Sequence, residues 1–166
     1  MATKVYAGLE ACFAGAVGAG GAAGTTLSKI TKPYQGGITI TGTAPTLNKF
    51  FREGEQYPGA TTTDVTSGGV EVTWEVMDFD DETLKFYFGD SAAGGIPGTT
   101  YRGEKTFRFD SISGNSILIP RLQYVATITG GISATEPLRI AVSGTVMAPK
   151  EGDMAIQTIA TPTSEV

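Results

Sequence analysis

The stretch EVTWEVMDFDDETLKFYFGD, residues 71–90, carries two hydrophobic periods and therefore decides the fold. Within residues 70–79, the apolar residues Val70, Val72, Trp74 and Val76 alternate with the polar residues Glu71, Thr73 and Glu75. This alternation predicts a β-strand with one apolar face and one hydrated face. Further on, Leu84, Tyr87 and Phe88 follow the i, i+3, i+4 spacing of one helix face. The stretch thus predicts a strand that runs directly into a short helix.

The carboxylates at this junction allow two interpretations. Asp78, Asp80, Asp81 and Glu82 fall within five positions, and so many carboxylates could bind a cation or perform acid–base chemistry. A calcium loop of the EF-hand type also needs a central glycine and a glutamate at its twelfth position, and this stretch has neither. The alternative is structural, because carboxylates stabilise the positively polarised start of a helix.

We expect the structural interpretation, with Asp80 as the N-cap of a helix over residues 81–88 and no metal. Phe79, before the cap, is placed to meet Leu84 in a hydrophobic staple. Gly89 is placed to end the helix. Each residue of the junction then has a structural task.

Most other segments have the composition of strands. They are residues 4–15, 25–34, 37–43, 99–112, 116–130 and 138–150, with one more strand expected within 154–159. Residues 46–54 fit either a strand or a short helical turn, and residues 16–24 form a glycine- and alanine-rich loop. We therefore predict an all-β domain over residues 1–150 with one short flanking helix, followed by a C-terminal tail over residues 151–166.

The composition excludes several classes of protein. Only 17% of the 166 residues are charged and 40% are hydrophobic, which is unlike a disordered chain. The chain contains no histidine and a single cysteine, Cys12, so histidine-dependent catalysis and cysteine metal clusters are excluded. A net charge of −5 with scattered basic residues argues against tight binding of nucleic acid. We expect no catalytic residues, no cofactor and no membrane span, since no stretch approaches the roughly 20 apolar residues that a span needs.

The glycine-rich loop formally contains a dinucleotide-binding pattern. Gly18, Gly20 and Ala23 match G-x-G-x-x-[GA], but no acidic residue lies between Glu10 and Glu53 to bind a ribose. A strand-like segment follows the loop where a helix is required. We expect a flexible linking loop.

Together these features resemble the major tail tube proteins of tailed bacteriophages, in particular those with long non-contractile tails. An N-terminal strand, a variable loop, threonine-rich strands and a long polar hairpin precede an alternating strand that leads into D-x-D-D-E-T-L-x-x-x-F-G. The resemblance covers most of residues 1–150, and residues 71–89 are its most specific part.

The resemblance implies a β-sandwich or half-barrel whose copies form rings, most commonly of six, that stack into a tube. Its partners would be further copies of the chain, the tip, terminator and tape-measure proteins of the tail, and genomic DNA that passes without specific binding. The protein would reside in the virion tail after assembly in the host cytoplasm. The loop that best matches the family's long hairpin is residues 53–69, with candidate interface residues Glu53, Glu55, Tyr57, Thr62, Asp64 and Val65.

Two alternatives belong to other classes. A carbohydrate-binding β-sandwich would need exposed aromatic platforms, for which Trp74, Tyr87 and Tyr101 are the candidates. Another virion component of related fold, such as a head decoration or tail completion protein, differs from a tube subunit only in the assembly that it forms. An enzyme is the least supported class, because no residue spacing indicates one.

Overall fold

The computed structural model describes residues 5–35, 37–44, 46–50, 53, 60–64, 69–92, 95, 101–133 and 135–162, with the backbone alone for 46–50 and 60–64. In this part of the chain the protein is mostly antiparallel β-sheet with one α-helix, which confirms the all-β prediction. The strands are β1 (Leu9–Gly15), β2 (Ser28–Ile30), β3 (Thr39–Thr43), β4 (Thr46–Phe50), β5 (Ala60–Asp64), β6 (Gly69–Val76), β7 (Tyr101–Ser111), β8 (Asn115–Thr129), β9 (Arg139–Val146) and β10 (Gln157–Ala160). The α-helix is α1 (Asp81–Phe88), and two short 3-10 turns are η1 (Ala19–Gly21) and η2 (Asp90–Ala92).

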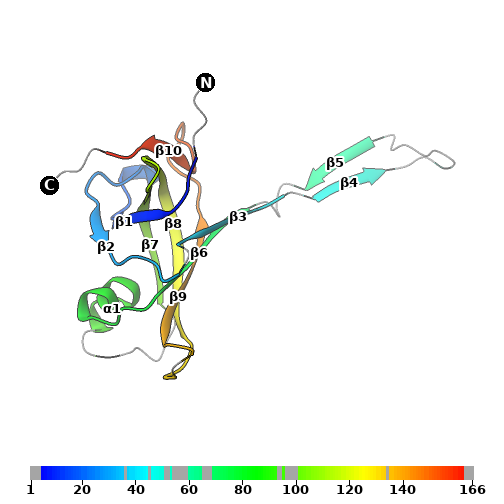
Figure 1. Cartoon of the computed structure of the whole chain (residues 1–166). Coiled ribbons are helices and arrows are strands. Elements are labelled where there is room, and N and C mark those ends of the chain that lie inside the picture. The colour runs from blue at the N-terminus through cyan, green and yellow to red at the C-terminus, as the bar shows by residue number, and fades with distance from the viewer. Residues whose placement is uncertain are drawn as a thin grey trace.

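Eight of these strands form one sheet in the order β2-β1-β7-β8-β9-β6-β3 (Figure 1). The eighth strand, β10, pairs with the first residues of β8, which β9 does not reach. Strands β4 and β5 form a separate two-stranded sheet. The long strands β7 and β8 therefore lie at the centre, and β2 and β3 lie at the two edges.

The eight-stranded sheet curls around its own core. Trp74 on β6 packs edge-on against Phe107 and Phe109 on β7, with ring centroids 5.3 and 5.8 Å apart. β6 and β7 are three places apart in the sheet, a separation of about 14 Å if the sheet were flat. The sheet must therefore bend so that β6 and β7 face each other across the core.

Helix α1 packs on the concave side of this sheet. The Trp74 indole N–H donates a hydrogen bond to the Tyr87 hydroxyl at 3.1 Å, and the Tyr124 hydroxyl donates one to the Phe86 carbonyl at 3.0 Å. The Phe86 ring also stacks against Tyr124. These contacts join the helix to β6 and β8 at once, so the helix is an integral part of the core.

Strand β1 is shorter than predicted and buries small side chains. The sequence predicts a strand over residues 4–15, but β1 begins at Leu9 and its buried residues are Ala11, Cys12 and Ala14. Cys12 lies opposite Phe109 and Ala14 opposite Phe107. The two large rings fill the space beside β1 and leave room for small side chains.

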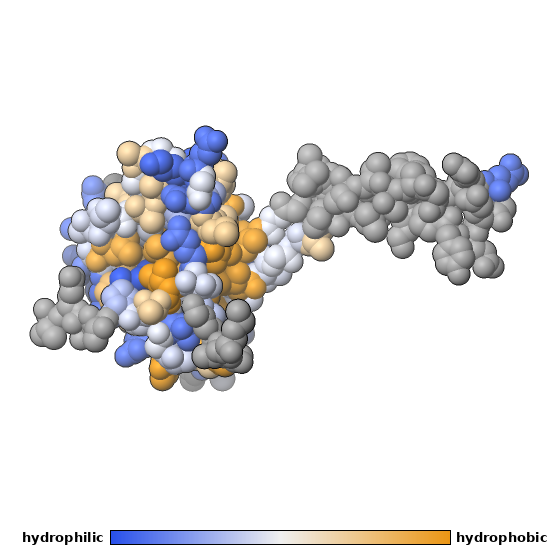
Figure 2. Space-filling model, turned by 90° about the horizontal axis from the view of Figure 1, so that it is seen from above, coloured by the Kyte–Doolittle hydropathy of each residue, from blue (hydrophilic) through white to orange (hydrophobic). Residues whose placement is uncertain are grey.

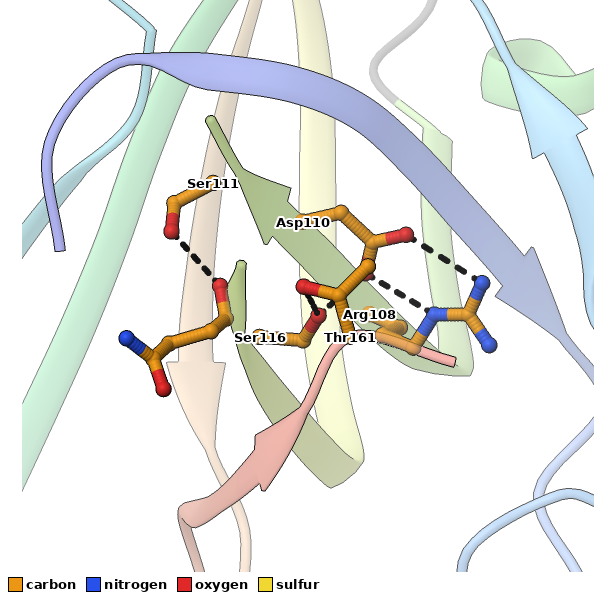
Figure 3. A network of polar contacts seen from close by, with 6 residues as sticks. Arg108, Asp110, Ser111, Ser116 and Thr161 are labelled. Atoms are coloured by element: carbon orange, nitrogen blue, oxygen red, sulfur yellow. Dashed lines mark hydrogen bonds and ion pairs between the residues drawn. The ribbon is translucent and has the colours of Figure 1, made fainter. Parts of the chain in front are cut away.

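Part of the predicted C-terminal tail pairs with the sheet, because the strand expected within residues 154–159 is present as β10 (Figure 3). Buried Asp110 accepts hydrogen bonds from the Arg108 guanidinium at 3.0 Å and the Ser116 hydroxyl at 2.7 Å. The Ser116 and Thr161 hydroxyl oxygens lie 2.9 Å apart, within hydrogen-bond distance, and the Thr161 N–H donates to the Gly114 carbonyl. Thr161 thereby fixes the end of β10. The strand lies at residues 157–160, slightly later than expected, because pairing with β8 sets its position.

Candidate functional site

The β4–β5 hairpin projects from the sheet and is the most distinctive feature of the surface. It follows β3 and precedes β6, and Figure 1 shows it extending away from the body of the protein as an arm. Among the described strands, β4 and β5 pair only with each other. An isolated two-stranded hairpin is at best marginally stable in water. The arm therefore has the character of an element that packs against another molecule.

The structure changes the predicted boundaries of this hairpin. The sequence of residues 46–54 fits either a strand or a helical turn, and in the structure residues 46–50 form strand β4. The predicted loop over 53–69 contains strand β5 and the first residue of β6, so it is not a continuous loop. Pairing of the threonine-rich segment 60–64 with β4 accounts for this difference, because composition alone indicated only a polar turn.

The candidate interface residues are distributed along this arm. Glu53 is an exposed turn residue between the two strands. Thr62 lies opposite Asn48, and Asp64 opposite Thr46, in the β4–β5 ladder. Glu55, Tyr57 and Val65 lie outside the described residues. Whether any of the six contacts a neighbour stays a prediction.

The strand-to-helix junction has the geometry that the sequence predicts. Asp80 accepts a hydrogen bond from the Thr83 N–H at 2.7 Å, and α1 begins at Asp81. Hydrogen bonds from the Thr83 side chain and backbone lower the pKa of the Asp80 carboxyl. Phe79 packs against the core cluster that contains Leu84. Gly89 ends the helix with φ of 87° and donates to the Lys85 carbonyl.

No group of three or more acidic, cysteine or histidine side chains within the described residues is arranged to hold a metal ion. Asp80 is already engaged in capping α1, and Asp81 has interactions of its own. The capping contact of Asp80 is the observation that supports the structural interpretation.

Two of the three aromatic residues proposed as sugar platforms are buried. Trp74 is 4% exposed and Tyr87 is 1% exposed, and the two form a hydrogen bond with each other inside the core. Burial raises the pKa of the Tyr87 hydroxyl well above its ordinary value. Only Tyr101, which is half-buried, keeps part of its ring at the surface. A flat aromatic platform for a sugar ring thus has little support.

The glycine-rich loop over residues 16–24 is held against the sheet, so it is a folded part of the domain and not a free linker. The Gly24 N–H donates to Thr106 Oγ1 at 2.8 Å, and the Lys150 N–H donates to the Gly21 carbonyl at 3.1 Å. Its only helical element is the three-residue η1, with no helix start to bind a pyrophosphate. The loop spans the edge of the sheet and ties the chain near residue 150 to it.

A cavity with both polar and apolar lining opens beside β3, the strand that leads into the arm. It measures about 330 Å³ and is lined by Tyr6, Leu9, Ile38, Ile40, Phe109 and Ile117, among others. Nearby, Ile112 is 70% exposed, and its N–H donates to the Gly8 carbonyl. Figure 2 shows apolar residues gathered on the body of the protein near the point where the arm leaves it. This region and the arm are the candidate assembly surfaces.

Comparison with known proteins gives no relative: no protein-family model matches the chain and no curated protein matches it. Within the described residues, no helix is both long and apolar enough to cross a membrane.

Proposed function

We propose that this protein is a structural subunit that assembles with copies of itself into rings, and that the rings stack into a phage tail tube through which DNA passes. The observation that carries the proposal is the β4–β5 arm, a paired hairpin that extends from a well-packed domain without a supporting layer of its own. Such an element gains stability when a neighbouring copy covers it.

The edges of the main sheet support the same proposal. Within the described part of the chain β2 and β3 each pair on one side only, and the other side can hydrogen-bond to a strand of another copy. Contacts that join different surfaces of successive copies close into rings or continue as filaments. Open strand edges and a projecting arm provide surfaces for both lateral and axial contacts.

Electron microscopy of the purified protein tests this function. We expect negative-stain images to contain rings or hollow tubes, and light scattering to give a mass well above that of the 166-residue chain. A protein that stays monomeric at high concentration, and that also fails to polymerise on tail-tip complexes of its own phage, would contradict the proposal. Discrete closed assemblies without tubes would favour the related role of a head decoration or tail completion protein.

A further inference from the structure

One broad face of the sheet carries almost no apolar side chains. It is the side opposite the core along β3, β6, β9, the second half of β8 and the start of β7. We call it the hydroxyl face, after its exposed side chains Thr39, Thr41, Thr73, Thr127, Ser143 and Thr145. Protein interfaces concentrate aromatic and aliphatic residues at their centres and exclude charge there. The hydroxyl face is therefore poorly suited to bind another protein.

The charges on the hydroxyl face balance within the face itself. Its acidic residues are Glu71, Glu75 and Glu104, and its basic residues are Arg102, Arg121 and Arg139. Arg139 Nη1 lies 2.8 Å from Glu75 Oε2. Arg121 binds Glu104 through two contacts, at 2.7 and 3.3 Å. Two of the three guanidinium groups are therefore already occupied by carboxylates of the same face.

Both arginines have further neighbours besides their carboxylate partners. The Tyr34 ring lies 5.9 Å from the Arg139 guanidinium, and Arg139 Nε is buried without a hydrogen-bond partner. Arg121 also donates from Nη1 to the Ala148 carbonyl at 3.4 Å, and its contact with Glu104 raises the pKa of its guanidinium. A phosphate that approached either arginine would have to replace a well-placed carboxylate, with loss of charge-assisted hydrogen bonds.

We infer that Glu75 and Glu104 hold Arg139 and Arg121 away from DNA phosphates, so that duplex DNA can move along the hydroxyl face without binding to it. The inference rests on the proposed function, since it names the face that a tube would present to its cargo. Affinity for DNA comes largely from cations that replace its counterions. A face on which two of the three arginines are paired with carboxylates, and whose three acidic residues balance its three arginines, offers hydroxyl groups to the cargo but little net positive charge.

The test removes the two carboxylate charges and keeps their shape. The variant Glu75→Gln with Glu104→Gln should gain affinity for a short labelled duplex, measured by fluorescence anisotropy. With about two added phosphate contacts, that affinity should fall about tenfold between about 50 and 200 mM salt, a dependence absent from the unmodified protein. Further substitution of Arg121→Gln and Arg139→Gln should abolish the gain.

The matched control is Glu71→Gln with Glu151→Gln, which changes the net charge equally. Among the described residues neither carboxylate takes part in an ion pair with an arginine. An equal gain in the control would show an effect of net charge alone and overturn the inference, as would no gain in the test variant. Electron microscopy separates this result from the proposed function. If the protein forms tubes but the test variant gains no affinity for DNA, the inference fails and the tube proposal stands. If the protein forms no tubes, the hydroxyl face has no role in DNA transport, even if the test variant gains affinity.

Discussion

At the scale of single residues, Asp80 sets where the strand of the decisive stretch becomes a helix. Its carboxylate accepts the Thr83 N–H at 2.7 Å, which satisfies a donor that the first helical turn leaves unpaired. The helix that follows buries Leu84, Tyr87 and Phe88 in the core. A single exposed carboxylate therefore fixes the start of the element that covers the concave side of the sheet.

Replacement of Asp80 tests this role. We expect Asp80→Ala to lower the melting temperature by about 2–4 °C, and Asp80→Asn, which can still cap a helix, to lower it less. Because the folded-state pKa of Asp80 is lowered, its stabilising effect is present above the ordinary value of 3.8 and is lost as the pH falls below it. A calcium-dependent rise in melting temperature that Asp80→Ala abolished would instead indicate a cation site.

Cys12 gives a second prediction, on stability at alkaline pH. Burial, with a smaller contribution from nearby Asp110, raises the pKa of its thiol from 9.0 to about 12. Above pH 9 the thiol ionises in the unfolded chain while it stays neutral in the folded protein, so the free energy of unfolding should fall between pH 9 and 12. Thermal unfolding across this range should show a shallower decline for Cys12→Ala than for the unmodified protein. Some decline should remain, because the pKa values of Tyr87 and Tyr124 are also raised by burial. Parallel curves for the two proteins would argue against this role of Cys12.

At the scale of elements, the hydrophobic periodicity of the sequence predicts those helices and strands that depend mainly on residues close to them in the chain. The alternation along β6 and the cap and spacing of α1 predicted both elements closely. β10 and β5 were missed or misplaced, because each short strand exists through pairing with a distant or weakly patterned partner. The packing of Tyr124 over Gly103 was equally hidden. A Cβ at Gly103 would lie 2.6 Å from the Tyr124 ring, a contact that no local pattern predicts.

The same limit applies to the candidate surfaces. The resemblance alone indicates residues 53–69 as an interface loop, and in the structure part of this segment, β5, belongs to the arm. The sequence predicts the part of the hydroxyl face on β6, since Glu71, Thr73 and Glu75 alternate with the buried residues of that strand. The sequence does not predict the ion pairs of this face, because Arg139 and Glu75 lie 64 positions apart in the chain.

Removal of the arm tests whether the β4–β5 hairpin is needed for assembly. Thr43 and Gly69 lie opposite each other at the ends of β3 and β6, so an Asn-Gly turn in place of residues 44–68 should close the shortened hairpin. The core loses no described buried residue, and we expect the melting temperature to change little. We also expect assembly to stop, as measured by light scattering and electron microscopy. Tubes that formed normally without the arm would exclude it as an assembly element.

At the scale of the whole molecule, stability should fall from the centre of the sheet toward its edges and the arm. β7, β8 and β9 have a partner on each side, and β7 and β8 supply many of the buried aromatic and aliphatic side chains. Among the described strands, β2 and β3 pair on one side only, and β4 and β5 of the arm pair only with each other. Local opening is easiest where few contacts oppose it. Assembly should therefore add most protection where the isolated subunit has least.

Hydrogen exchange in the isolated subunit and in the assembled form tests this gradient. We expect amides of β7 and β8 to exchange slowly in both forms, because their hydrogen bonds and burial do not depend on a neighbour. Amides of β4 and β5 should exchange rapidly in the subunit and slowly in the assembly, with smaller changes at β2 and β3.

The hydroxyl face provides an internal control: its side chains should stay open to a small water-soluble label in both forms, because no protein covers them. Equal exchange of β4 and β5 in the two forms would mean that the arm does not contact a neighbour. Protection of the hydroxyl face from the label would mean that this face is itself an interface between copies.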